Sequence, residues 1–307
     1  LRDSPETFSD VGVATINGQT LLSTVDVLFP MVDDHEVFAR IVVNHVLNDI
    51  YAALGKPEFG LAILGAPRGM LASDKMVVQM LSAARAAIEA ESATLIGGHT
   101  LSNQESLFLG FSVTGTPLHT EVTYAVNRND PILMTKRLGT NVASLRWKLD
   151  NVIVEAHKDV VEGMLQSSAP TSRILARNGV MHCTDISGFG FVVNLLSLIS
   201  RANVGATIKG NSIPVYESVK AHLGPLAACT RQSLYNKEYV TNQGVDLSGL
   251  DPFSESVWMD AQTAGGLLFI CPAAKEEVVV SELVSAGVEV AKIGYVNESL
   301  GLRFTPA

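Results

Sequence analysis

The chain is 307 residues long, 47% hydrophobic and 17% charged, with a net charge of −9. This length and apolar content suit one large or two medium domains with buried cores. Because the acidic balance contains no block of Lys or Arg, we expect neither nucleic acid nor an anionic membrane as partner. No apolar run reaches the roughly 20 residues that cross a bilayer, and no secretory signal opens the sequence, which favours a cytoplasmic protein.

The first third of the chain predicts short strands and amphipathic helices. Residues 21–27 and 61–64 have the apolar pattern of strands. Apolar side chains recur at a helical period from Val37 to Leu54, and Asp33 or Asp34 precedes them as a natural N-cap. Further along, the pattern predicts a helix at 73–91 and strands at 94–96 and 107–114.

The polar, turn-rich stretch 117–130 predicts a domain boundary, which divides the chain into domains 1–122 and 123–307. The second domain alternates strand and helix patterns in an order that fits an α+β fold. Residues 221–250 show the weakest periodicity and are expected to be rich in loops. The predicted strands are 131–135, 180–183, 204–208, 266–270 and 288–295, and the predicted helices are 171–178, a helix after Gly190, and 273–285.

The stretch 182–190 places Asp185, Gly188 and Gly190 directly before the apolar run 191–199. Glycines let a backbone approach a phosphate, and the first N–H groups of a helix point at a bound anion. An adjacent carboxylate can hold the Mg²⁺ that accompanies the phosphate. The same residues also fit a glycine-punctuated turn with a solvated Asp, and turn chemistry alone does not decide between the two.

Other acidic and glycine positions recur at the ends of predicted elements. Asp10 and Asp26 lie near strand ends, where a capping or turn role is the simpler interpretation for each residue alone. Asp49 lies on the predicted helix before Leu54, and its spacing alone fits a plain polar face. His99 follows two glycines and suits either a turn or a ligand contact. No Walker loop or dinucleotide fingerprint is present, which disfavours the familiar nucleotide folds.

Taken together and in this order, the motifs resemble those of the selenophosphate synthetase (selenide, water dikinase) family. That family belongs to a superfamily with aminoimidazole ribonucleotide synthetase, thiamine monophosphate kinase and a hydrogenase-maturation protein. The resemblance extends over nearly the whole chain. The matching runs are 23–34, 48–52, 61–65, 97–99, 184–190 and 262–268.

The resemblance implies an α+β protein of two domains: a strand-rich N-terminal domain for dimerisation and ATP binding, and a ferredoxin-like C-terminal domain. It implies a homodimer with ATP sites between the domains near the dimer interface. The implied reaction converts ATP, selenide and water to selenophosphate, AMP and phosphate, with Mg²⁺ and with K⁺ as a further candidate ion. The implied Mg²⁺ positions are Asp10, Asp49 and Asp185, and the implied ATP-contacting positions are Thr7, Asp26, Asp49, Gly97, Gly98 and His99.

Some positions depart from the family pattern. The family's catalytic Cys or selenocysteine and its Lys would precede Leu1, so no catalytic residue is assigned here, and we expect a fragment or a fusion-derived core, with an oxidoreductase as candidate fusion partner. The glycine-rich turn after Lys136 has Arg137 in place of Pro and Asn141 in place of Gly. Lys136 itself is expected to be structural or phosphate-facing. Two alternatives remain open: an ATP-binding assembly domain without complete catalysis, and a diverged small-molecule kinase that forms ADP.

Overall fold

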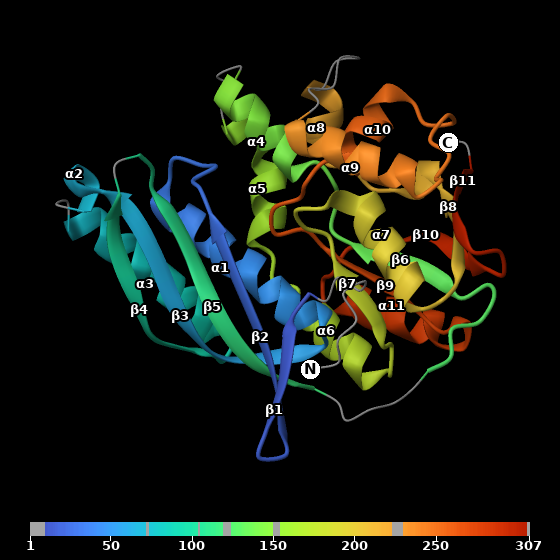
Figure 1. Ribbon diagram of the computed structural model, residues 1–307, viewed down its shortest axis with the longest axis horizontal. Helices are drawn as coiled ribbons and strands as arrows, with labels where there is room; N and C mark the ends of the chain where they lie inside the picture. The colour runs from blue at the N-terminus through green and yellow to red at the C-terminus, as the bar shows by residue number, and fades with distance from the viewer. Residues whose placement is uncertain are drawn as a thin grey trace.

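The computed structural model describes residues 10–71, 74–103, 105–118, 124–149, 154–222 and 230–305. Two sheets, one in each half of the chain, are each covered by helices, which confirms the predicted α+β fold of two domains (Figure 1). Within these ranges, no helix is long and apolar enough to span a bilayer.

The first sheet has five strands in the order β1-β2-β5-β3-β4. Only the pairing of β3 with β4 is parallel. The expected strands are present but longer than predicted, and β1 was not predicted. It forms a hairpin with β2 through Asn17 and Gly18, which both have positive φ, as a two-residue Asn-Gly turn requires. The strands are β1 (Gly12–Ile16), β2 (Gln19–Leu28), β3 (Gly55–Pro67), β4 (Thr94–Asn103) and β5 (Phe108–Pro117).

Helix α1 (His35–Ala52) lies between the two sheets and is buried along most of its length. The carboxylate of Asp34 accepts hydrogen bonds from the backbone N–H groups of Glu36 and Val37, which confirms one of the two predicted N-caps. The helix packs on β2, β3 and β5 and also on elements of the C-terminal domain. This double contact explains why polar residues of α1, such as Asn48, are buried. Helices α2 (Arg68–Leu71) and α3 (Asp74–Ala90) complete the first domain.

The second sheet has six strands in the order β11-β8-β10-β6-β9-β7. In the run β10-β6-β9-β7 each strand is antiparallel to its neighbour. In chain order these strands read 4-1-3-2, which is the ferredoxin-like arrangement that was predicted. Strands β8 and β11 extend this core at one edge. The bounds are β6 (Pro131–Thr135), β7 (His182–Asp185), β8 (Gly205–Lys209), β9 (Leu267–Ile270), β10 (Val290–Asn297) and β11 (Gly301–Thr305).

Helices cover the second sheet, with α7 and α9 on one side in Figure 1. The expectation that 221–250 is mainly loop was wrong in part, because α9 occupies 12 of these residues. Thr230 caps it, and tertiary packing against α7 and α10 stabilises a helix of weak periodicity. The helices are α4 (Thr140–Leu149), α5 (Lys158–Leu165), α6 (Ala169–Arg177), α7 (Gly190–Arg201), α8 (Glu217–His222), α9 (Arg231–Asn242), α10 (Pro252–Met259) and α11 (Glu276–Ser285), with short 3-10 turns at Val154–His157, Gly210–Ser212 and Ala273–Lys275.

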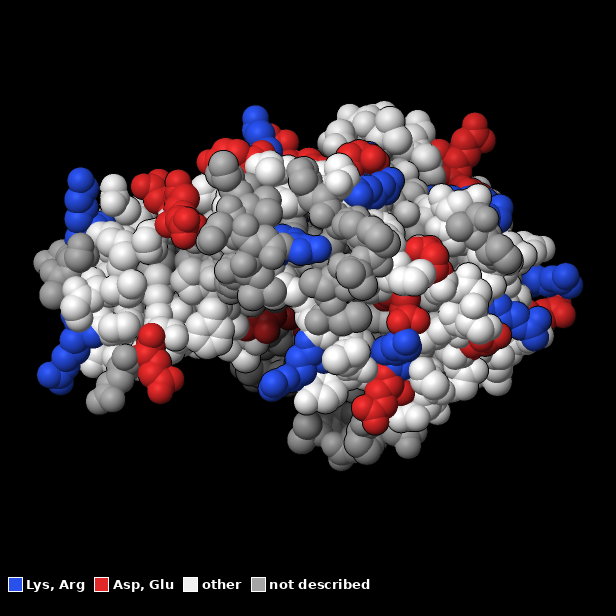
Figure 2. All heavy atoms as spheres, turned by 90° about the horizontal axis from the view of Figure 1, so that it is seen from above, with Lys and Arg blue, Asp and Glu red and all other residues white. Residues whose placement is uncertain are grey.

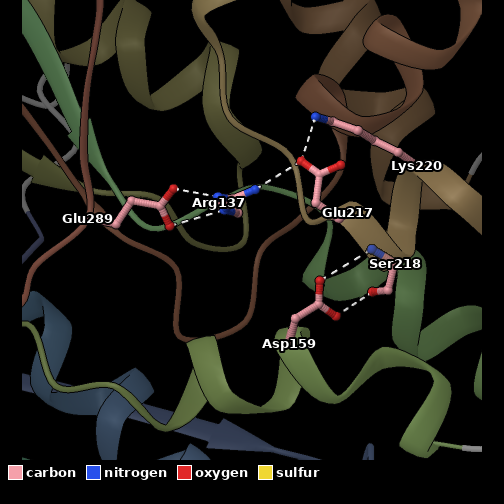
Figure 3. A network of polar contacts seen from close by, with 6 residues as sticks. All are labelled: Arg137, Asp159, Glu217, Ser218, Lys220 and Glu289. Atoms are coloured by element: carbon pink, nitrogen blue, oxygen red, sulfur yellow. Dashed lines mark hydrogen bonds and ion pairs between the residues drawn. The ribbon is translucent and has the colours of Figure 1, made fainter.

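Arg137, which replaces the usual Pro after β6, belongs to a network of ion pairs (Figure 3). Its guanidinium lies 2.8 Å from a carboxylate oxygen of Glu289 and 3.0 Å from one of Glu217. The network ties the end of β6 to the start of α8 and to the segment before β10. Because the carboxylates are largely exposed, solvent screens these pairs and each contributes little to stability. On the face seen in Figure 2, basic and acidic side chains are interspersed.

Candidate functional site

Four aspartates from both domains gather where α1 meets the second sheet. Asp10 lies just before β1, Asp26 on β2, Asp49 on α1 and Asp185 at the end of β7. Burial raises the pKa of Asp185 well above its ordinary value, and the nearby charges of the other three raise it further. The structure thus brings together four aspartates that lie far apart in the sequence.

This gathering of carboxylates is costly when all of them are ionised. Burial raises the pKa of Asp49 to about 7, and the charges of Asp26 and Asp10 add to that effect. The pKa of Asp10 is raised too, because burial outweighs the opposing charge of Arg201. Like charges in a buried site favour binding of a cation there, since it offsets their mutual repulsion.

Hydroxyl groups and one guanidinium contact these carboxylates. Thr24 Oγ1 donates to Asp49 Oδ2 at 2.5 Å, and Thr184 Oγ1 lies 3.0 Å from Asp10 Oδ1. The Arg201 guanidinium is 3.7 Å from Asp10 Oδ2. Both threonines lie inside motifs that carried the family resemblance, although no role was predicted for either. Arg201 had no signal in the sequence, because it reaches Asp10 only through the packing of α7.

Asp185 has one oxygen engaged and one without a partner. Ser187 Oγ donates to Oδ1 at 3.3 Å, whereas the buried Oδ2 has no hydrogen bond among the described residues. A carboxylate oxygen with no donor suits a hard cation such as Mg²⁺. Among the described residues, no three His, Cys, Asp or Glu side chains are grouped so as to hold an ion alone. A Mg²⁺ here would therefore need ligands from phosphate or water.

Two buried basic side chains lie behind the aspartates. His45 Nε2 is 3.7 Å from Asp26 Oδ2, and burial lowers the pKa of this imidazole. Burial also lowers the pKa of Lys136 to about 7. The ammonium of Lys136 donates to the backbone oxygens of Gln166 and Ala264, at 2.7 and 2.8 Å. These contacts agree with the structural role that was one of the two expectations for Lys136.

The glycine run does not reach the aspartates within one chain. Gly97, Gly98 and His99 lie in the edge strand β4, so the turn that was one of two alternatives for His99 is not formed. The strand continues to Asn103 because it pairs with β3 throughout. Two strands, β5 and β3, separate it from β2, which carries Asp26. A hollow of about 390 Å³ between α3 and β4 borders all three residues of the run. Thr7 lies outside the described residues.

Asn141, which replaces a usual Gly, contacts the buried carboxylate of Asp260, a residue outside this group of four. Its side-chain amide donates to both oxygens of Asp260, at 3.0 and 3.1 Å, and Thr230 Oγ1 donates to one of them at 2.6 Å. Burial nevertheless raises the pKa of Asp260 to about 6. The departure from the family pattern is therefore accompanied by new hydrogen-bond donors for this carboxylate.

Replacing Asn141 with Ala should destabilise the protein increasingly as the pH rises through about 6. The donors of Asn141 favour the ionised carboxylate of Asp260, so their removal costs most when that group is charged, roughly 1.5–3 kcal/mol at pH 8. At pH 5 the carboxyl is largely protonated in the folded state, and the loss is smaller. Urea unfolding of both proteins at pH 5 and pH 8 measures the difference. A loss that is equal at both values would contradict this assignment.

Comparisons with known proteins agree with this architecture. Residues 8–116 match the N-terminal domain of AIR synthase related proteins, and residues 127–305 match the C-terminal domain of the same group. Over 303 residues the chain is 29% identical to selenide, water dikinase of Aeromonas salmonicida, covering 96% of this chain and 85% of that protein. It is 30% identical over 270 residues to the same enzyme of Bdellovibrio bacteriovorus, covering 85% and 75%.

Solved structures share the fold at lower sequence identity. Thiamine monophosphate kinase from Aquifex aeolicus has a TM-score of 0.70 and 17% identity, covering 96% of this chain and 90% of that one. The hydrogenase maturation protein HypE from E. coli has a TM-score of 0.66 and 17% identity, covering 92% and 82%. The chain therefore belongs to the family of AIR synthase related proteins, as a member similar in sequence to the selenide, water dikinases.

Proposed function

We propose that the chain binds ATP with Mg²⁺ at the interdomain aspartates and uses it, with one water molecule, to phosphorylate selenide, so that ATP, selenide and water give selenophosphate, AMP and phosphate. The observation that carries this proposal is the gathering of Asp10, Asp49 and Asp185 from both domains, with Asp185 Oδ2 buried and without a partner. The similarity to selenide, water dikinases supports the choice of substrate. The fold is also that of HypE in a complex with ATP and of AaThiL in a complex with AMPPCP and TMP, which supports the nucleotide.

In this proposal Asp10, Asp49 and Asp185 hold Mg²⁺, and Asp26 contacts the nucleotide. The ion would supply positive charge against both the carboxylates and the phosphate oxygens. Thr24 and Thr184 keep the carboxylates of Asp49 and Asp10 oriented. Removing one of these hydroxyl groups would leave the carboxylate with greater freedom and a weaker preference for its ionised form. The residues thus provide a preorganised negative site for a triphosphate that arrives with its metal.

Phosphorus NMR of ATP incubated with the chain, Mg²⁺, K⁺ and anaerobic selenide tests this function, with a selenide-free sample as control. Selenide-dependent AMP together with a selenophosphate signal is the expected result. Formation of ADP would instead indicate a small-molecule kinase. ATP that stays intact, while a titration shows binding, would indicate an assembly or regulatory domain.

We further propose that two copies of the chain form a homodimer through the exposed face of the first sheet. Val25 and Leu61 are 58% and 44% exposed, and both lie beside Ser112 in the strand register, so they share one face. The opposite face packs on α1 and α3, whereas no element of the described part of the chain covers this apolar face. An uncovered apolar sheet face is typical of an interface.

Such a dimer also accounts for the distance between β4 and the aspartates. In this dimer the first sheets of the two copies stack face to face, and the two-fold axis runs between them, parallel to the strands. Rotation about this axis places β4 of one copy over the β1–β2 edge of the other. The glycine run, with His99, would then approach the elements that carry Asp10 and Asp26 in the second copy. In this proposal one nucleotide site draws on both chains.

The Leu61→Lys variant should be monomeric in light scattering at concentrations where the unmodified protein is dimeric, because burying the ammonium in an apolar interface is unfavourable. Val284, which is 61% exposed on α11 of the other domain, provides the control. A Val284→Lys variant should keep the dimer. If Leu61→Lys leaves the molar mass unchanged, this face is not the interface.

A further inference from the structure

The loop 262–266 enters β9 in an unfavourable backbone conformation. Ala264 has a φ of +48°, in the left-handed region that residues other than Gly rarely adopt, and it is completely buried. Such a conformation is strained and persists only where the surroundings impose it. The surroundings of Ala264 are therefore informative.

Three buried side chains hold this residue and its neighbour. The backbone N–H of Ala264 donates to His45 Nδ1 at 3.1 Å, and its oxygen accepts from Lys136 Nζ at 2.8 Å. Asn48 Nδ2 donates to the oxygen of Gly265 at 2.7 Å. His45 and Asn48 both belong to α1, so the N-terminal domain holds a loop of the C-terminal domain in place. We call these three contacts the Ala264 clamp.

The clamped loop is also bonded to the segment that carries Asp185. The backbone N–H of Ile186 donates to Gly266 O, and that of Gln262 donates to Ser187 O, both at 2.9 Å. An ideal Cβ placed on Gly265 would lie 2.1 Å from Ile186 O, so the two segments are in direct backbone contact. A displacement of the loop would therefore displace Asp185 as well.

We propose that His45 and Asn48 are positioning residues: by holding Ala264 and Gly265, they fix Asp185 of the C-terminal domain opposite Asp49 of α1. Asn48 precedes Asp49 directly in the chain, so one turn of α1 both carries one carboxylate and sets the place of the other. His45 accepts through Nδ1, which leaves Nε2 as the nitrogen facing Asp26. The importance of this positioning for catalysis rests on the proposed function. The link from His45 and Asn48 through the loop to Asp185 does not depend on it.

Amide hydrogen exchange tests the link in the absence of nucleotide. In the His45→Leu variant, which keeps the bulk but loses the acceptor, the amides of Ala264 and Ile186 should exchange at least tenfold faster than in the unmodified protein. Amides of the remote strand β11 serve as the internal reference. His45→Asn is the matched variant, because its Oδ1 can take the place of Nδ1, and its rates should stay within threefold of the original.

A second substitution separates this role from general packing. Gly adopts a φ of +48° without strain, so Ala264→Gly in the His45→Leu background should bring the Ile186 exchange rate back to within threefold. The affinity for Mg²⁺ and a non-hydrolysable ATP analogue should follow the same order: lost at least tenfold in His45→Leu, and largely restored in His45→Asn and in the double variant.

Exchange rates of Ala264 and Ile186 that remain unchanged in His45→Leu would overturn the proposal. So would equal acceleration of these amides and of the β11 reference, because the substitution would then act on global stability alone. If the unmodified protein binds no nucleotide, the proposed function fails, but the exchange experiment still decides whether the clamp positions Asp185.

Discussion

Substitution of Asp185 with Asn is expected to reduce Mg²⁺-dependent nucleotide turnover at least 100-fold while making the protein without metal more stable. Of the four gathered carboxylates, Asp185 is the one contributed by the C-terminal domain, and its buried Oδ2 has no hydrogen-bond partner among the described residues. Loss of its charge removes a ligand for the cation. The same loss removes a charge whose burial, together with repulsion by the neighbouring aspartates, raises the pKa of this group, so the melting temperature should rise by about 2–4 °C at pH 8.

The opposite signs of these two effects make the test specific. Turnover is measured by phosphate release across a Mg²⁺ titration, and stability by calorimetry with and without the metal. Glu105→Gln provides the control, because it removes one negative charge from an exposed position outside the site. Turnover that keeps its Mg²⁺ dependence in Asp185→Asn would exclude Asp185 from the metal site.

The second large effect is expected from Gly266→Ala, which should prevent stable folding. An ideal Cβ on Gly266 would lie 1.7 Å from Thr135 O and 2.5 Å from Thr135 C. Both are backbone atoms of β6, the central strand next to β9, so no rotation of a side chain relieves the overlap. We expect a loss of more than about 4 kcal/mol in the free energy of unfolding.

Gly249→Ala is the matched control, since no atom lies within 4 Å of its ideal Cβ and its φ is not positive. Urea unfolding followed by circular dichroism compares the two variants where both are soluble. The control should unfold within about 0.5 kcal/mol of the original protein. An unfolding free energy for Gly266→Ala within 1 kcal/mol of the original value would show that β6 and β9 can move apart.

These glycines illustrate what the sequence could and could not predict. The pattern 262–268 was recognised as a family motif, but no role was predicted for Gly265 or Gly266. The structure explains why Gly occupies positions 265 and 266: the backbones of Ile186 and Thr135 approach them too closely for a side chain to fit. Such a contact joins residues far apart in the chain, so no local pattern can reveal it.

The elements themselves were predicted best where one apolar face repeats over many residues. Helix α1 and its Asp34 cap follow from local spacing and local hydrogen bonds. Strand β1 was missed because its residues are exposed and lack alternation, although the Asn-Gly turn beside it was a usable signal. Helix α9 was missed because its stability comes from packing rather than from periodicity.

The aspartates of the site and an ATP site between the domains were implied by the resemblance, whereas the local patterns did not predict that these aspartates meet. Spacing alone left Asp10 and Asp26 as turn residues, because their partners are distant in the sequence: Thr184 and Arg201 of the other domain for Asp10, and His45 of α1 for Asp26. The hydroxyl group of Thr184 and the guanidinium of Arg201 reach Asp10 only in the folded chain. Polar contacts of this kind follow no repeating pattern in the sequence, so the sequence alone does not predict them.

Helix α1 has a consequence for how the chain folds. It supplies core side chains to the first sheet, and it also supplies Asn44 Nδ2 to the backbone oxygen of Met164 and Asn48 Nδ2 to that of Gly265. Neither half can close its interior without this helix, so separation would leave buried polar groups unmatched on both sides. The two domains are separate in architecture but form one cooperative folding unit. The chain should therefore unfold as a whole rather than domain by domain.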